Sequence, residues 1–166
     1  IKEAANISFG ALYSYFSNTE EIFLEILELS NVENDSKENE LEATAWGKIE
    51  FFLDTQAAGF DRLQHSMVPV TYEYLMTSWR KEKRLQLLQN RYEQGVKELL
   101  SFIQQGKANG EFSPTLSETA IAKMIISTLE GLNISSLFLE QKLVEAKNQI
   151  EVLKSVLKTI LNLKEN

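Results

Sequence analysis

Apolar residues recur at spacings of three and four along most of the chain, the pattern that places one apolar stripe along an α-helix. The 166 residues are enough for one ordinary domain, or for one domain with a small appendage. Seven glycines and two prolines are too few for the many tight turns of a β-sandwich or barrel. The sequence therefore predicts an all-α fold.

The periodic segments divide into several helices. Residues 31–42 form the most polar and turn-prone stretch, so we expect a linker or helix junction there. We therefore divide the chain into a short N-terminal region, residues 1–30, and a longer helical region, residues 31–166, which begins with this polar stretch. Apolar spacing and capping residues predict helices in the longer region over about 42–63, 69–79, 82–109, 117–141 and 143–163.

The last two predicted helices carry more apolar surface than a single layer of packing covers. Pairing them with their copies in a second chain makes a four-helix bundle around a two-fold axis, so we expect a homodimer. The alternative is that the same side chains form the core of a single chain. The expected contact residues are Ile125, Leu129, Leu132, Ile150, Leu153, Leu157 and Ile160.

Composition excludes several classes of protein. The chain has a net charge of −7, which is unlike a general binder of polyanions, and it contains no cysteine for disulfides or thiolate metal sites. No window approaches the ~20 apolar residues of a membrane span. His65 is the single histidine, and we expect it at the surface or in a cap. We therefore expect a cytoplasmic protein that is not an enzyme and uses no metal or cofactor.

Residues 1–16 contain the most specific pattern in the chain. Residues 1–6 read as the end of one helix, Ile7 and Ser8 as a turn, and residues 9–15 as a short second helix. Two helices joined in this way form the helix-turn-helix unit, which places its second helix in the major groove of DNA. Because the sequence opens within the tail of a helix, we expect the unit to be incomplete here, with its first helix missing.

The opening residues resemble the DNA-binding region of TetR-family (tetracycline-repressor-like) transcriptional regulators. Residues 106–112 and 129–132 are similar to two landmarks of that family's regulatory domain. The resemblance implies a DNA-binding region with a connecting helix over 1–30 and a helical regulatory domain over 31–166. The stretches that carry it are Ile1-Lys2-Glu3-Ala4-Ala5-Asn6-Ile7-Ser8, Leu12-Tyr13-Ser14-Tyr15-Phe16 and Thr19-Glu20-Glu21-Ile22.

The resemblance implies that residues at positions matching the family's motif make the same kinds of contact with DNA. The first turn of the second helix would face base edges, tyrosine hydroxyls would face phosphates, and Thr19 would add a contact from the next helix. Two departures lower the attraction for phosphate, since many relatives have Lys or Arg in place of Phe9 and most have Lys in place of Thr19. The candidate DNA-binding residues are Ser8, Phe9, Gly10, Ala11, Tyr13, Ser14, Tyr15 and Thr19.

The resemblance also implies a cavity in the regulatory domain that takes a small hydrophobic or cationic-aromatic inducer. Ligand would favour a helix arrangement that moves the two recognition helices away from consecutive major grooves of a palindromic operator. The alternative is that these side chains simply fill a core. The candidate lining residues are Trp46, Phe52, Phe60, Tyr72, Met76, Trp79, Tyr92 and Met124.

A second interpretation stays open. The missing cations at positions 9 and 19 also fit an all-helical small-molecule-binding or interaction protein that does not bind DNA. A repressor binds duplex DNA with a steep salt dependence, whereas this alternative does not bind it.

Overall fold

The computed structural model describes residues 14–18, 20–26, 44–77 and 80–164. The chain divides into two compact units, Ile1–Glu42 and Ala43–Asn166, and each is described by itself. The predicted boundary between residues 30 and 31 lies within the first of these units.

In the first unit, a helix over residues 20–26 begins at a reciprocal cap. The Glu21 N–H donates to Asn18 Oδ1 at 2.9 Å, and the Ser17 N–H donates to Glu21 Oε2 at 2.5 Å. This is close to a capping box, in which two backbone donors are satisfied by side chains three or four residues away. The sequence predicts a hydroxyl cap from Thr19. In the structure Asn18 accepts from the Glu21 N–H; Thr19 lies outside the described residues, so its cap stays a prediction.

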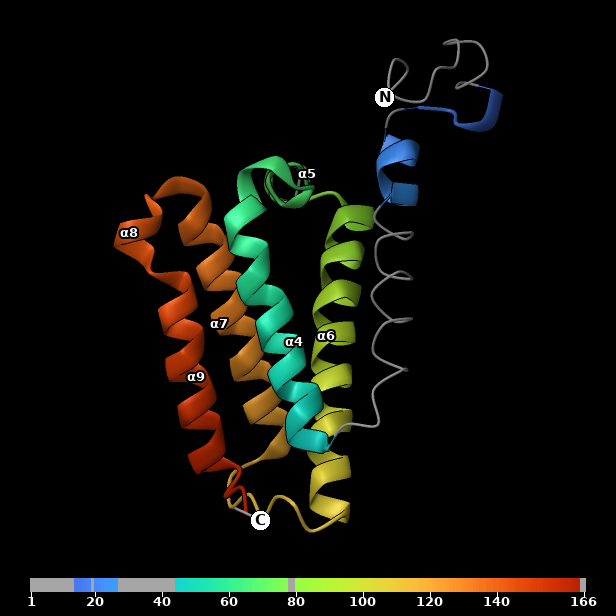
Figure 1. The fold of residues 1–166 in the computed structure, drawn as a ribbon. Coiled ribbons are helices and arrows are strands. Elements are labelled where there is room, and N and C mark those ends of the chain that lie inside the picture. Colours follow the sequence, from blue (N-terminus) through green and yellow to red (C-terminus); the bar gives the residue numbers. More distant parts are fainter. Residues whose placement is uncertain (1–13, 19, 27–43, 78–79, 165–166) are drawn as a thin grey trace. The chain divides into compact units, whose positions relative to one another are not determined.

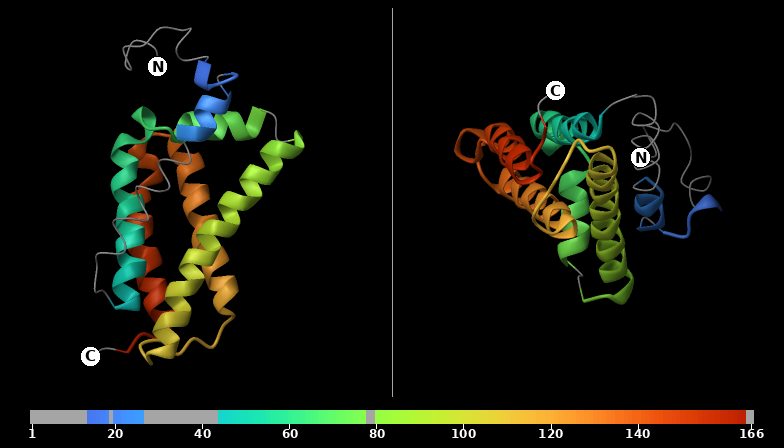
Figure 2. Two further views of the ribbon diagram at one scale, coloured as in Figure 1. Left: turned by 90° about the vertical axis from the view of Figure 1, so that its right-hand side faces the viewer. Right: turned by 90° about the horizontal axis from the view of Figure 1, so that it is seen from below.

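The second unit is a helical bundle, and no strand occurs in the part of the chain that the structure describes. Helices α4, α6, α7 and α9 run alongside one another, and α5 lies across one end of the bundle (Figures 1 and 2). The all-α prediction is confirmed. The elements are α4 (Ala45–Gly59), the 3₁₀ helix η1 (Phe60–His65), α5 (Val68–Thr77), α6 (Glu82–Ala108), α7 (Glu118–Phe138), α8 (Gln141–Val144) and α9 (Ala146–Ile160).

Several helix ends differ from the prediction by a few residues, and two differences change the elements themselves. The helix expected over 42–63 is α-helical only to Gly59 and then tightens into the 3₁₀ helix η1. The last turn before α9 forms a separate element, α8, which ends at Glu145 with a left-handed φ of 48°. A non-glycine residue in this region breaks the helical path, so α8 and α9 are distinct.

The other ends follow the expected chemistry. The Ser117 hydroxyl accepts from the Ala120 N–H and begins α7, while the Ser66 hydroxyl accepts from the Val68 N–H and begins α5. Gly110 follows the end of α6 with a φ of 75°, a conformation that glycine adopts without a Cβ clash.

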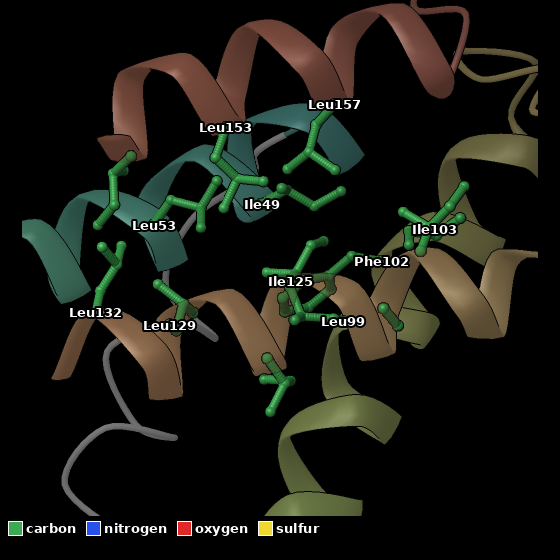
Figure 3. Packing of buried hydrophobic residues seen from close by; sticks show 14 of the residues in the cluster. Ile49, Leu53, Leu99, Phe102, Ile103, Ile125, Leu129, Leu132, Leu153 and Leu157 are labelled. Carbon is green, nitrogen blue, oxygen red and sulfur yellow. The ribbon is translucent and has the colours of Figure 1, made fainter. Parts of the chain in front are cut away.

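The core of the bundle is formed mainly by aliphatic side chains from α4, α6, α7 and α9, together with aromatic residues such as Phe102 (Figure 3). Six of the seven residues predicted for the dimer contact lie in it: Ile125, Ile150 and Leu157 are 0% exposed, and Leu129, Leu132 and Leu153 are at most 7% exposed. Ile160 packs against the same cluster. A side chain that is covered by its own chain offers no area to a second copy. For these six residues the prediction of a dimer contact is wrong, because they belong to the protomer core; Ile160 is only partly buried, and its contact with a second copy stays a prediction.

One charged side chain is buried in the contact between α4 and α9. Lys154 has 10% of its side chain exposed, and its Nζ lies 2.5 Å from Asp54 Oδ1 and 2.8 Å from Glu151 Oε1. Burial works to lower the pKa of Lys154, but its hydrogen bonds to these two carboxylates outweigh that effect and raise the pKa above its usual value. The ammonium therefore stays charged.

Candidate functional site

A polar cluster joins α5, α6 and α7 in the bundle. The phenol of Tyr72 donates a hydrogen bond to the Glu130 carboxylate, and Arg91 Nε lies 4.0 Å from Glu130 Oε1. Side chains of Glu130 and Arg91 are 35% and 45% exposed, so the cluster is open to solvent on one side. We call Tyr72, Arg91 and Glu130 the polar cluster.

The environment of Tyr72 keeps its phenol neutral. Burial is the main cause that raises the pKa of Tyr72, and its hydrogen bond to Glu130 acts in the same direction. A phenol that cannot ionise near neutral pH is a constant hydrogen-bond donor. It orients the Glu130 carboxylate, whose remaining lone pairs can accept from another partner.

Close packing of α6 and α7 positions the carboxylate. A Cβ built on Gly95 would lie 2.8 Å from Ile126 Cδ1, so a larger residue at position 95 would force the two helices or the isoleucine to shift. Gly95 follows Arg91 by one helical turn, and Ile126 precedes Glu130 by one turn. The glycine therefore sets the separation at which Arg91 faces Glu130.

The eight residues predicted to line a cavity do not come together in one place. Trp46 and Phe60 are core residues, and Phe52 and Tyr92 are partly buried against the same core. Trp46 also lies beneath Lys158 Nζ, at 5.2 Å, in the first turn of α4, whereas Tyr72 is in α5 at the opposite end of the bundle (Figure 1).

Two other predicted lining residues, Met76 and Met124, lie outside the core. Met76 is 59% exposed, Met124 is 38% exposed, and Trp79 lies outside the described residues. Tyr72 is thus the one predicted residue found in the polar cluster. Two of the cluster's three members, Glu130 and Arg91, were missed by the cavity prediction. A lone acid within the apolar run 121–139 was the available signal for Glu130.

Two of the eight predicted DNA contacts, Ser14 and Tyr15, lie within the described residues. Ser8, Phe9, Gly10, Ala11, Tyr13 and Thr19 lie outside the described residues. Ser14 and Tyr15 are helical and exposed, and Tyr15 has 83% of its surface exposed. The tyrosine side chain is therefore accessible to a phosphate, as expected for its matching position in the family.

Other kinds of site receive no support from the structure. In the described ranges, no three His, Asp or Glu side chains come close enough to hold a metal ion. The same part of the chain has no helix that is both long and apolar enough to cross a membrane. His65 is exposed at the end of η1, as expected for a surface histidine.

The chain is similar over nearly its whole length to a known regulator, and its bundle matches a known family of domains. Residues 48–147 match the family model described as tetracyclin repressor-like, C-terminal domain. Over 167 aligned residues the chain is 32% identical to YfiR, an uncharacterized HTH-type transcriptional regulator of Bacillus subtilis (strain 168). The alignment covers 99% of the chain and 82% of YfiR. The molecule is a transcriptional regulator of the helix-turn-helix class. It belongs to the TetR family, which confirms the resemblance read from the opening residues.

Proposed function

We propose that this regulator is a repressor that binds a palindromic operator as a homodimer and leaves it when a small hydrophobic cation binds the regulatory domain. The observation that carries the ligand part is the polar cluster. It combines an aromatic ring with a partly desolvated carboxylate, and two of its three helices, α5 and α7, are rich in apolar residues.

The charge of the cluster favours a cation. A cationic group can pair with Glu130 while the Tyr72 ring supplies a negative face beside it. Arg91 is a weak competitor, because it is nearly half exposed and lies at 4.0 Å from the carboxylate. An exposed pair of this kind contributes only about 0–1 kcal/mol, so a ligand can replace it at little cost.

The proposed homodimer uses the outward faces of α7 and α9 rather than their buried faces. On α7, Met124 and Phe138 are exposed and flank Gly131, each seven residues away. On α9, Val152 is 63% exposed and Val156 is 42% exposed. A seven-residue apolar repeat suits the packing of helices side by side. We call Met124, Gly131, Phe138, Val152 and Val156 the outer face.

Gly131 supports contact with a second copy at this face. Glycine within a helix costs about 1 kcal/mol relative to alanine. No described atom lies within 4 Å of a Cβ built on Gly131, so the protomer itself does not need a glycine there. A second α7 that approaches closely would need it.

The DNA part of the proposal follows from the family and from the exposed Tyr15. The test is a binding titration of the full-length protein with the promoter of its own gene, followed by addition of tetraphenylphosphonium. We expect the DNA to be bound and the cation to release it. Binding of the cation by a protein that ignores the DNA would favour the second interpretation, a helical binding protein without DNA binding. The function that we propose includes no catalytic activity.

A further inference from the structure

The N-terminus of α4 is capped by a carboxylate from a distant part of the chain. Glu111, in the turn after α6, accepts from the Ala45 N–H through Oε2 at 2.9 Å and from the Trp46 N–H through Oε1 at 2.8 Å. The Thr44 hydroxyl accepts from the Gly47 N–H at 3.0 Å. The first turn of a helix has four backbone donors without helical partners, and Glu111 satisfies two of them. Its negative charge also complements the positive end of the helix dipole.

Glu111 is itself held from both sides by backbone hydrogen bonds. Its N–H donates to the Gly106 carbonyl at 2.8 Å, and its carbonyl accepts from the Lys164 N–H at 3.1 Å. The neighbouring Ser113 N–H donates to the Leu161 carbonyl at 2.9 Å. These bonds fix Glu111 to the end of α6 and to the segment after α9. Through its two hydrogen bonds to the Ala45 and Trp46 amides, the carboxylate holds the first turn of α4 in place relative to both.

The capped end of α4 is the place where the chain passes from the first unit into the second. The first unit ends at Glu42, and α4 begins at Ala45. Any displacement of the first turn of α4 displaces the point at which the DNA-binding unit is attached. A dimer can occupy two half-sites about one turn of DNA (~34 Å) apart only if the two attachment points keep a matching separation.

We infer that Glu111 is a positioning residue for DNA binding, which it controls through α4 without touching DNA. The inference rests on the proposed function, since it requires a dimer that binds an operator. Without the carboxylate, the first turn of α4 loses two charge-assisted hydrogen bonds and frays. The attachment points of the two DNA-binding units then sample a wider range of separations, and binding at both half-sites carries a larger entropic cost.

The experiment compares Glu111→Gln with wild type in the full-length protein. Glutamine has nearly the same shape, but it has lost the charge, and only one of its two terminal atoms is an acceptor. The matched control is Glu118→Gln, which removes a carboxylate from the same end of the bundle. Glu118 pairs with Lys107 at 2.5 Å, and the bonds that hold the start of α4 come from Glu111 and Thr44. Three quantities are measured: hydrogen exchange at the Ala45 and Trp46 amides, affinity for the promoter of the protein's own gene, and the thermal midpoint.

We expect Glu111→Gln to speed exchange at both amides and to weaken promoter binding by about tenfold, the equivalent of losing one charged hydrogen bond. The assay temperature is kept well below the thermal midpoint, so that both proteins are fully folded and a loss of stability alone leaves the affinity unchanged. Glu118→Gln should leave the exchange and the affinity at wild-type values.

Three results overturn the inference, and they are distinguishable. If wild type binds the promoter and Glu111→Gln binds it equally well, Glu111 has no positioning role and the proposed function stands. If wild type itself ignores the promoter, the proposed function fails and the inference fails with it. An equal loss of affinity in Glu118→Gln also overturns the inference, because the effect would then belong to any carboxylate at this end.

Discussion

The ring of Phe112 lies directly against Gly106: a Cβ built on the glycine would be 2.2 Å from Cδ2 of the ring and 2.9 Å from the Ala45 Cβ. Gly106 is in the last turns of α6, and Phe112 is 2% exposed. The absence of a side chain at position 106 therefore lets the turn after α6 fold back over the helix and bring Glu111 to the start of α4.

Replacement of Gly106 by alanine should destabilise the protein despite the higher helix propensity of alanine. Overpacking of this kind costs about 1–3 kcal/mol, and the ring cannot move without disturbing the core. Gly59→Ala is the matched control, since no described atom lies within 4 Å of its added Cβ. We expect denaturant melts to show a loss for Gly106→Ala and no loss for Gly59→Ala. Equal stability of the two variants would contradict the close packing.

The buried ammonium of Lys154 makes stability depend on alkaline pH. Its pKa is raised in the folded protein, so its contribution is complete below the unfolded value of about 10.4 and is lost as the pH rises through the folded value. Lys154→Met removes this dependence and should change stability at pH 7 by less than about 1 kcal/mol, because the two carboxylates left behind are 55% and 66% exposed and stay hydrated, while methionine fills the buried volume of the lysine stem. Asp54→Asn is a second variant and should cost about 1 kcal/mol at pH 7, because the ammonium keeps Glu151 alone.

Urea melts between pH 8 and 12 check this account. Wild type should lose more stability than Lys154→Met over the alkaline part of the range. If the free energy of unfolding falls with pH in the same way in both proteins, deprotonation of Lys154 is not the cause of the loss of stability at alkaline pH.

Charge discrimination tests the polar cluster as a ligand site. Tetraphenylphosphonium and tetraphenylborate have nearly the same shape and opposite charge. Glu130→Gln should weaken binding of the cation by roughly tenfold, as expected for loss of one charge-assisted contact, and should leave the anion unaffected or bound more tightly. Isothermal titration calorimetry measures both. Equal losses for the two ions would point to a structural effect of the substitution, and an unchanged cation affinity would remove Glu130 from the site.

Substitutions on the outer face test the dimer. Val152→Glu places a charge in the proposed contact and should raise the dimer dissociation constant by at least tenfold, because an unpaired charge would be buried there. Leu143→Glu is the matched control, since Leu143 is 70% exposed in α8 and is not part of the outer face. Sedimentation velocity should show monomer for the first variant and wild-type behaviour for the second. A dimer that tolerates Val152→Glu would exclude α9 from the contact.

Helix periodicity predicted the architecture well, because burial of an apolar stripe dominates in a bundle. Asn109 and Gly110 correctly marked the end of α6, and Ser117 correctly marked the start of α7. The pattern could not separate a face buried in the protomer from one that meets a second copy. Ile150 and Leu157 have the seven-residue spacing that is typical of a helix pair in a dimer. In the structure both side chains are buried within their own protomer.

Sites made by contacts between distant residues were the least predictable. Tyr72 and Glu130 are 58 positions apart, and Trp46 and Glu111 are 65 positions apart. Neither pair has a local sequence signal, because each depends on how helices pack. The aromatic residues selected for a cavity share apolar character with core residues, so composition alone placed Trp46 and Tyr72 in one group although they occupy opposite ends of the bundle (Figure 1).

The most direct test of the central claim is a fluorescence anisotropy titration of the full-length dimer with its own promoter over a series of salt concentrations. A repressor that contacts several phosphates should show log affinity falling with log salt, by about 0.9 for each phosphate neutralised, and should prefer a palindromic duplex to a scrambled one. Absence of binding at every salt concentration, by a protein shown to be folded and dimeric, would contradict the account.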